Sequence, residues 1–155
     1  KGLEGEVRYS WKRNLQCMAN ISWQDARDQR QYKEDGKLSA TYLNRVPNRP
    51  WLFGTAEVNY TFHDVCRKNS SLRLETSYQW VHWYYLTWEA YGSKESKAQI
   101  PAQHVVNAGV TYSLENGKYN VSVNCDNLFD RLVYDHYKLQ KPGRSFFLKF
   151  RVFLN

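Results

Sequence analysis

The chain lacks any long hydrophobic run. Of its 155 residues 42% are hydrophobic, and the mean hydropathy is −0.74. No segment approaches the roughly 18 apolar residues that a membrane-spanning helix needs, so a helical membrane protein is excluded. A barrel of membrane-crossing strands is not excluded, because only alternate residues of such strands face lipid.

The sequence also lacks the patterns of catalytic and metal sites. The cysteines are Cys17, Cys66 and Cys125, and the histidines are His63, His82, His104 and His136. The cysteines have no metal-binding spacing, and the histidines form no HxH or HxxxH pair. No nucleophile–base arrangement, Walker loop or GxGxxG motif is present. We therefore expect no enzymatic activity, no metal ion and no cofactor.

Acidic residues are fewer than basic ones, with 15 Asp and Glu against 22 Lys and Arg, which gives a formal charge of +7. A positive charge of this size is compatible with binding to nucleic acid. The basic residues, however, are spread over loops and alternate positions rather than gathered in one stripe. A water-filled lumen or an anionic lipid surface accounts for them equally well, so we expect no nucleic-acid binding.

What the chain does contain is alternation of apolar and polar residues, which is typical of strands with one apolar face. The pattern predicts seven strands, at residues 3–11, 15–24, 55–62, 72–85, 106–114, 119–126 and 145–155. Trp11 and Trp23 fall near opposite ends of the first pair, as expected of aromatic belts at membrane interfaces. The fourth strand is predicted to be the longest. Trp83 and Tyr85 at its far end are expected to be belt residues or to stack on a ligand.

The connections between these strands alternate in length. Short turns are predicted at 12–14, 63–71 and 115–118, and long loops near 25–50, 89–103 and 130–144. Asn116-Gly117 supplies the positive φ angles of a tight hairpin turn. Outer-membrane barrels show this asymmetry between periplasmic turns and external loops. A soluble β-sandwich gives the same alternation of faces, because periodicity does not say which side is buried.

The C-terminal segment carries the most specific motifs. The closing strand has an apolar face and would be an exposed edge unless it closed a barrel. The run "DNLFDRLVYDHYKLQKPGRSFFLKF" at 126–150 resembles the end of TonB-dependent outer-membrane receptors of the Bacteroidetes type. "RVPNRPWLF" at 45–53 and the run at 92–123 are similar to other strands of that barrel. The positions that match the family motifs are Asn127, Leu128, Phe129, Asp130, Pro142, Gly143 and Arg144.

This resemblance implies an all-β fold, an antiparallel up-and-down transmembrane β-barrel of which residues 1–155 form the C-terminal portion. It implies outer-membrane localisation, with the C-terminus in the periplasm. The plug domain and the TonB box of such receptors are expected to lie outside this chain. Members use energy from the TonB complex to import a scarce ligand, usually a ferric siderophore, haem or cobalamin. The partners implied are therefore outer-membrane lipid, TonB and a small-molecule ligand.

Within the predicted external loops, aromatic and cationic residues are the candidates for ligand contact. They are Arg27, Arg30, Trp88, Tyr91, Tyr134, His136 and Tyr137. The aromatic rings would stack on a ligand, and His136 would contact iron or haem. The arginines would pair with an anionic chelate or with lipopolysaccharide phosphate. For each of these aromatic residues and His136, the alternative of an exposed ring at the rim of the barrel is favoured over ligand contact.

Two other functions are compatible with these patterns. A nonspecific outer-membrane barrel of the porin type would need no energising partner. A soluble β-sandwich binding module would bury its apolar faces internally and would stay monomeric without detergent.

Overall fold

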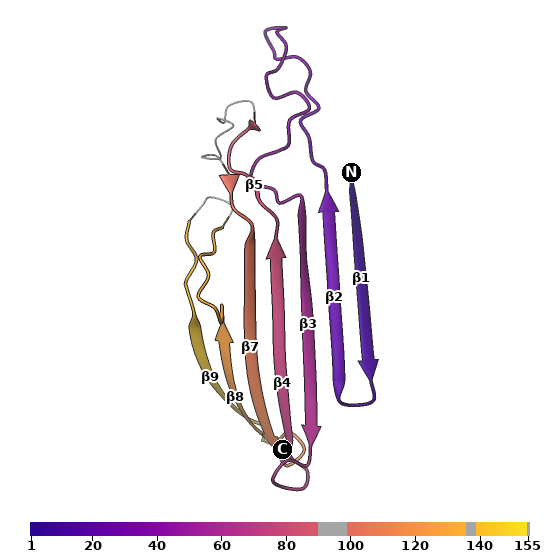
Figure 1. Cartoon of the computed structure of the whole chain (residues 1–155), viewed down its shortest axis with the longest axis vertical. Coiled ribbons are helices and arrows are strands. Elements are labelled where there is room, and N and C mark those ends of the chain that lie inside the picture. Colours follow the sequence, from indigo (N-terminus) through magenta and orange to yellow (C-terminus); the bar gives the residue numbers. More distant parts are fainter. Residues whose placement is uncertain (90–98, 136–138, 155) are drawn as a thin grey trace.

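The computed structural model describes residues 1–89, 99–135 and 139–154, and they form one long antiparallel sheet (Figure 1). Its seven strands are β1 (Gly2–Trp11), β2 (Leu15–Gln24), β3 (Leu52–His63), β4 (Ser71–Val81), β7 (Gln103–Leu114), β8 (Tyr119–Asp126) and β9 (Ser145–Val152). They are hydrogen-bonded in chain order, each to the next. A separate two-stranded ribbon joins β5 (Tyr84–Tyr85) to β6 (Gln99–Ile100). The predicted up-and-down order is confirmed.

The register places the predicted apolar residues on one continuous face. Ala19 on β2 lies opposite Val7 on β1 and Ala56 on β3. Towards the other edge of the sheet, on the same face, Val123 on β8 lies opposite Val110 on β7 and Leu148 on β9. Because side chains alternate along a strand, the residues between them form a polar face. Cross-strand hydrogen bonds on that face include Asn20 Nδ2 to Thr55 Oγ1 at 2.8 Å.

The apolar face has no cover. Among the described residues, the buried hydrophobic side chains are Tyr84, Ile100 and Cys125, whereas Leu3 and Leu148 on the apolar face are 72% and 77% exposed. No second sheet packs on the seven strands in the part of the chain that the structure describes. The described residues therefore form a single-layered main sheet and not a β-sandwich.

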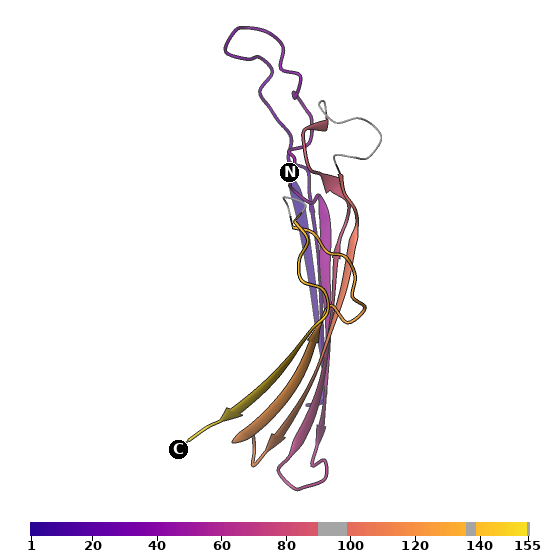
Figure 2. The same ribbon diagram turned by 90° about the vertical axis from the view of Figure 1, so that its left-hand side faces the viewer.

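The polar face is the hollow one. In Figure 2 the sheet is bent, with β8 and β9 curving away from the other strands. A depression of about 570 Å³ lies in the polar face, lined mainly by charged and amide side chains from β3 to β9. Glu57, Arg73, Glu75, Asp126 and Lys149 supply its charges. A sheet that is polar on its concave side and apolar on its convex side is the wall of a water-filled barrel.

Aromatic residues mark the two borders of the apolar face. Trp11 lies opposite Leu15 at one end of the β1–β2 pair, and Trp23 lies opposite Leu3 at the other. Eight residue steps separate the two levels, which is roughly 26 Å along a strand and about 20 Å across a bilayer at the usual tilt. The prediction that these tryptophans lie at opposite ends of the hairpin is confirmed.

The two ends of the sheet differ. The short connections 12–14, 64–70 and 115–118 lie together at what we call the turn end. The long connections 25–51, 82–102 and 127–144 lie at the loop end, where the first of them extends furthest (Figure 1). Among the described residues, no helix is long and apolar enough to span a membrane.

The prediction for the fourth strand was wrong in its length. β4 ends at Val81 with 11 residues, whereas β3 and β7 have 12. The His82 backbone N–H donates to Leu52 O at 2.9 Å, and the chain then leaves the sheet. Tyr84 and Tyr85 pair with Ile100 and Gln99 instead. Aromatic residues continue through this bend, so the sequence gives no sign of the break.

Candidate binding site at the loop end

The three long connections meet above the hollow face. The Asn48 backbone N–H donates to Tyr85 O at 2.7 Å, which joins the first connection to the second. The Tyr134 backbone N–H donates to the Gln103 side-chain Oε1 at 2.7 Å, which joins the third connection to the start of β7. These bonds hold segments far apart in the sequence side by side at one end of the sheet.

A pocket of about 380 Å³ lies where they meet, on the hollow side of the sheet. All three connections contribute to its lining, together with the upper ends of β4 and β7: Asn48, Pro50, Gln79, Val81, Tyr84, Gln103, Val105, Val133, Tyr134, Asp135 and Lys141. Tyr84 and its β6 partner Ile100 are almost fully buried. The volume and the mixture of apolar and polar groups suit a small-molecule ligand.

Two tyrosines at this end, Tyr84 and Tyr85, have raised pKa values. Burial raises the pKa of Tyr84, and the Asp135 carboxylate adds to the shift. Burial also raises the pKa of Tyr85, and Glu89 contributes a smaller part. Both phenols therefore remain neutral donors well above physiological pH. Tyr84 lines the pocket together with Asp135 and Lys141, which supply one charge of each sign, whereas Tyr85 is not part of the lining.

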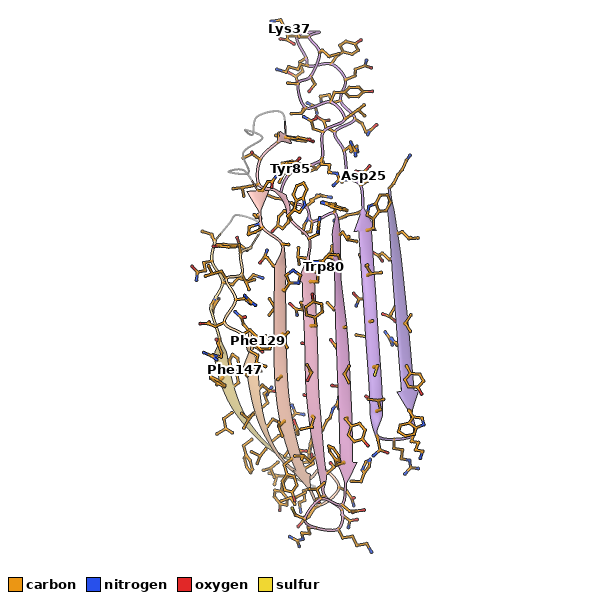
Figure 3. The ribbon with its side chains drawn as sticks, in the orientation of Figure 1. Asp25, Lys37, Trp80, Tyr85, Phe129 and Phe147 are labelled. Carbon is orange, nitrogen blue, oxygen red and sulfur yellow. The ribbon has the colours of Figure 1, made fainter. Side chains whose placement is uncertain are left out.

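The base of the loop at 25–50 is held by Asp25, which Figure 3 labels just beyond β2. Arg27 Nε donates to both Asp25 carboxylate oxygens at 3.0 and 2.8 Å, and Arg27 Nη1 donates to Leu43 O at 3.1 Å. Arg45 Nε lies 3.5 Å from Asp25 Oδ1, and its guanidinium lies 4.6 Å from the centre of the Trp51 ring. The hydrogen bond from Arg27 lowers the pKa of Asp25, against a smaller opposing effect of burial.

We expect Asp25→Asn to loosen this loop without affecting the sheet. The lowered pKa means that the contribution of Asp25 to stability is present above its unfolded pKa of about 3.9 and is lost as the pH falls through its lower folded value. Near neutral pH, amide exchange of Asp28, Leu43 and Val46, whose N–H groups bond across the loop, should be about two- to fivefold faster in the variant. Below the folded pKa the wild type should exchange like the variant.

Asp35→Asn is the matched control, because the Asp35 carboxylate lies 3.6 Å from Lys37 at the exposed tip of the same loop. It should leave the three amides unchanged. Equal exchange in the Asp25 and Asp35 variants at neutral pH would contradict the anchoring role of Asp25.

The two segments that match the family motifs bind each other at the base of the third connection. Asn127 is buried, with a positive φ of 51°, and its side chain bonds to both the N–H and the carbonyl of Arg131 at 2.9 and 2.8 Å. Asp130 Oδ1 accepts the Arg144 N–H at 2.8 Å. A Cβ on Gly143 would lie 2.5 Å from the same oxygen, so a larger residue there would displace the Asp130 carboxylate. The motifs therefore fix where the loop leaves β8 and enters β9.

The predicted ligand-contact residues are only partly brought together. Tyr134 lines the pocket, and Trp88 is half-buried in the segment after β5. Arg27 is engaged with Asp25 and Leu43, and Arg30 is exposed, with its backbone N–H bound to Asp28 Oδ1 at 2.9 Å. Tyr91, His136 and Tyr137 lie outside the described residues.

Sequence reasoning missed several residues of the pocket. Asp135 is next to the predicted Tyr134 and His136, and Lys141 is next to the motif residue Pro142, but nothing in the spacing of Asp135 and Lys141 marks them as pocket residues. Gln103 lies before the alternating part of β7, and only the fold shows that its side chain holds Tyr134. In the described part of the chain no three His, Cys, Asp or Glu side chains are grouped to hold a metal ion.

Comparison with known proteins gives one family. A family model described as "TonB dependent receptor-like, beta-barrel" matches residues 1–128, most of the chain. A search of the curated proteins found no match. The matched range runs from β1 through β8 and the start of the NLFD motif.

Proposed function

The chain belongs to the TonB-dependent receptor-like β-barrel family, and we propose that it forms the C-terminal part of a larger barrel that takes up a ferric siderophore or haem. Family membership places it in the outer membrane, in TonB-dependent transport. Members of the family are transporters and not enzymes.

One observation carries the proposal: all three long connections lie at one end of a wall that is apolar outside and hollow and polar inside. The pocket at that end is lined by all three of them. With the turn end in the periplasm, the pocket opens at the cell surface above the lumen. A ligand captured there enters the barrel directly.

The chemistry of the loop end favours a planar or aromatic ligand that carries charge. In the pocket, Tyr134 offers a ring and the Tyr84 phenol is a neutral donor. Lys141 and the exposed Arg30 offer positive charge to a carboxylate, catecholate or hydroxamate oxygen. Ferric siderophores and haem combine these features, and cobalamin, which is bulkier, would need more of the loops to open. A nonspecific channel would need no such grouping.

The test is ligand binding by the whole receptor that contains this chain. Tyr134→Ala and Trp88→Ala are each expected to weaken binding of the cognate chelate about fivefold, the usual loss for one aromatic stacking partner. Binding is measured by fluorescence quenching against a panel of ferric siderophores, haem and cobalamin, and uptake is measured with and without TonB.

Tyr9→Ala is the matched control, because Tyr9 is an exposed aromatic residue on the apolar face of β1 near the turn end. It should bind ligand normally. Heat-modifiable migration in gels confirms that each variant has assembled. Unchanged affinity in both loop variants, or uptake that does not need TonB, would overturn the proposal.

A further inference from the structure

The turn end of the sheet concentrates positive charge. Its connections carry five basic residues, Lys12, Arg13, Arg67, Lys68 and Lys118, and two acidic ones, Asp64 and Glu115. All five basic side chains are exposed. Asp64 is engaged inside its own turn, where its Oδ1 accepts the Asn69 N–H at 2.8 Å. The outward-facing charge of this end is therefore strongly positive.

The three turns form one continuous rim. The Thr61 backbone N–H donates to Asn14 O at 2.8 Å, and the Asn116 N–H donates to Asn69 O at 3.0 Å. The Phe153 N–H donates to Lys118 O at 2.9 Å, which ties the last turn to the end of β9. The basic side chains are thus presented from a fixed backbone and not from independent loops.

Two of the lysines lie over aromatic rings at the border of the apolar face. Lys12 Nζ is 4.8 Å from the centre of the Trp11 ring, and Lys118 Nζ is 5.5 Å from that of Tyr119. Trp11 lies opposite Leu15, and Tyr119 lies opposite Leu114 and Val152, so both rings belong to the lipid-facing side. Trp and Tyr settle at the level of lipid headgroups, and a lysine over such a ring has its ammonium at the same level.

We propose that this rim, through Lys12 and Lys118, binds the phosphate groups of anionic phospholipids in the leaflet next to the turn end. The positive charge of the rim favours an anionic lipid headgroup. The rim also adjoins the lipid-facing apolar face, so a phospholipid whose phosphate lies at this border would have its acyl chains against the strands. The inference requires only the position of the barrel in the membrane and is independent of the imported ligand.

The experiment uses the whole receptor in nanodiscs of phosphatidylcholine with a minority of phosphatidylglycerol. The lipid retained after detergent extraction is quantified by mass spectrometry. Wild-type protein should retain phosphatidylglycerol in excess of its share. In Lys12→Gln/Lys118→Gln the excess should fall about fivefold or more, since each basic residue near an anionic leaflet contributes about that factor.

Two matched variants separate the site from net charge. Lys33→Gln/Lys37→Gln removes the same charge from the tip of the loop at 25–50 and should retain the excess, and Lys12→Arg/Lys118→Arg should also retain it. Equal loss in the loop-tip variant would mean that only net charge matters, and an unchanged lipid excess in the Gln variant would overturn the proposal. Abolition of the wild-type excess by inorganic phosphate would assign the rim to a soluble anion instead.

Ligand binding is measured on the same samples. Lipid selectivity that is lost while ligand affinity is retained supports the rim independently of the proposed uptake function. If the Gln variant fails to assemble, the wild type and the Arg variant still test the proposal. Both should retain phosphatidylglycerol in excess of its share, and the absence of that excess in both would contradict the proposal.

Discussion

Replacing Val58 by arginine is expected to destabilise the membrane-embedded barrel by about 1–3 kcal/mol, because the penalty for a cation on the lipid face falls from about 2–4 kcal/mol at the bilayer midplane to about 0–1 kcal/mol at the border, and Val58 lies between the two. Val58 lies near the middle of β3, between Cys17 on β2 and Thr76 on β4, and is 47% exposed on the apolar face. No described residue covers it, so the guanidinium would meet hydrocarbon.

Asn59→Arg is the control one residue away. Asn59 lies on the hollow face between Gln16 and Glu75, and it lines the same depression as Glu57. An arginine there would meet water and two carboxylates, so its effect should lie within about 0.5 kcal/mol of zero.

The measurement is urea unfolding of the whole receptor in lipid vesicles, followed by heat-modifiable migration and intrinsic fluorescence. A large loss of unfolding free energy in Val58→Arg, with little change in Asn59→Arg, would support a lipid-facing apolar face and a water-facing polar face. The reverse order would mean that the apolar face is turned away from lipid and would overturn the assignment of inside and outside.

The strands could be predicted from sequence because each side chain reports on one face. The alternation in β1 to β3 and β7 to β9 persists in the register of neighbouring strands, so a one-residue error in any strand would have mixed the faces. The turn at 115–118 could also be predicted, because Asn-Gly favours positive φ angles, and Asn116 and Gly117 have φ angles of 56° and 89°. Local chemistry decides these features.

The loop end could not be predicted in the same way, because its contacts join residues that share no period. Gln103 and Tyr134 are 31 positions apart, and Asp25 contacts Arg45 across a loop with no repeat. The end of β4 was missed because aromatic residues suit a strand, a membrane border and a loop core equally. The sequence predicts that Arg27 pairs with an anionic chelate or lipopolysaccharide phosphate, and only the structure shows that it is bound to Asp25.

Asn127→Ala is expected to have the largest effect among changes outside the lipid face, a loss of about 3 kcal/mol. Its side chain makes two hydrogen bonds to Arg131, each worth about 1 kcal/mol, and the change leaves both Arg131 backbone groups without these partners. Asn127 also has a φ of 51°, a conformation that costs alanine about 1 kcal/mol more than asparagine or glycine.

Asn116→Ala separates these contributions. Asn116 has nearly the same φ, 56°, but it is exposed at the turn end. Its change should cost only the backbone part, about 1 kcal/mol. Asn127→Gly avoids the backbone strain but still loses the two hydrogen bonds. Its loss of stability should therefore fall between those of the two alanine variants. Equal losses for Asn127→Ala and Asn116→Ala would contradict the structural role of the Asn127 side chain.

The consequence should reach the binding site. The Asn127 side chain holds Arg131 at the start of the loop whose next turn positions Tyr134 against Gln103, and Asp130 holds the other end of that loop at Arg144. Releasing Arg131 therefore frees Tyr134 to move away from the pocket. Asn127→Ala should weaken ligand binding by the whole receptor under conditions in which the barrel remains assembled, whereas Asn116→Ala, at the opposite end of the sheet, should leave binding unchanged.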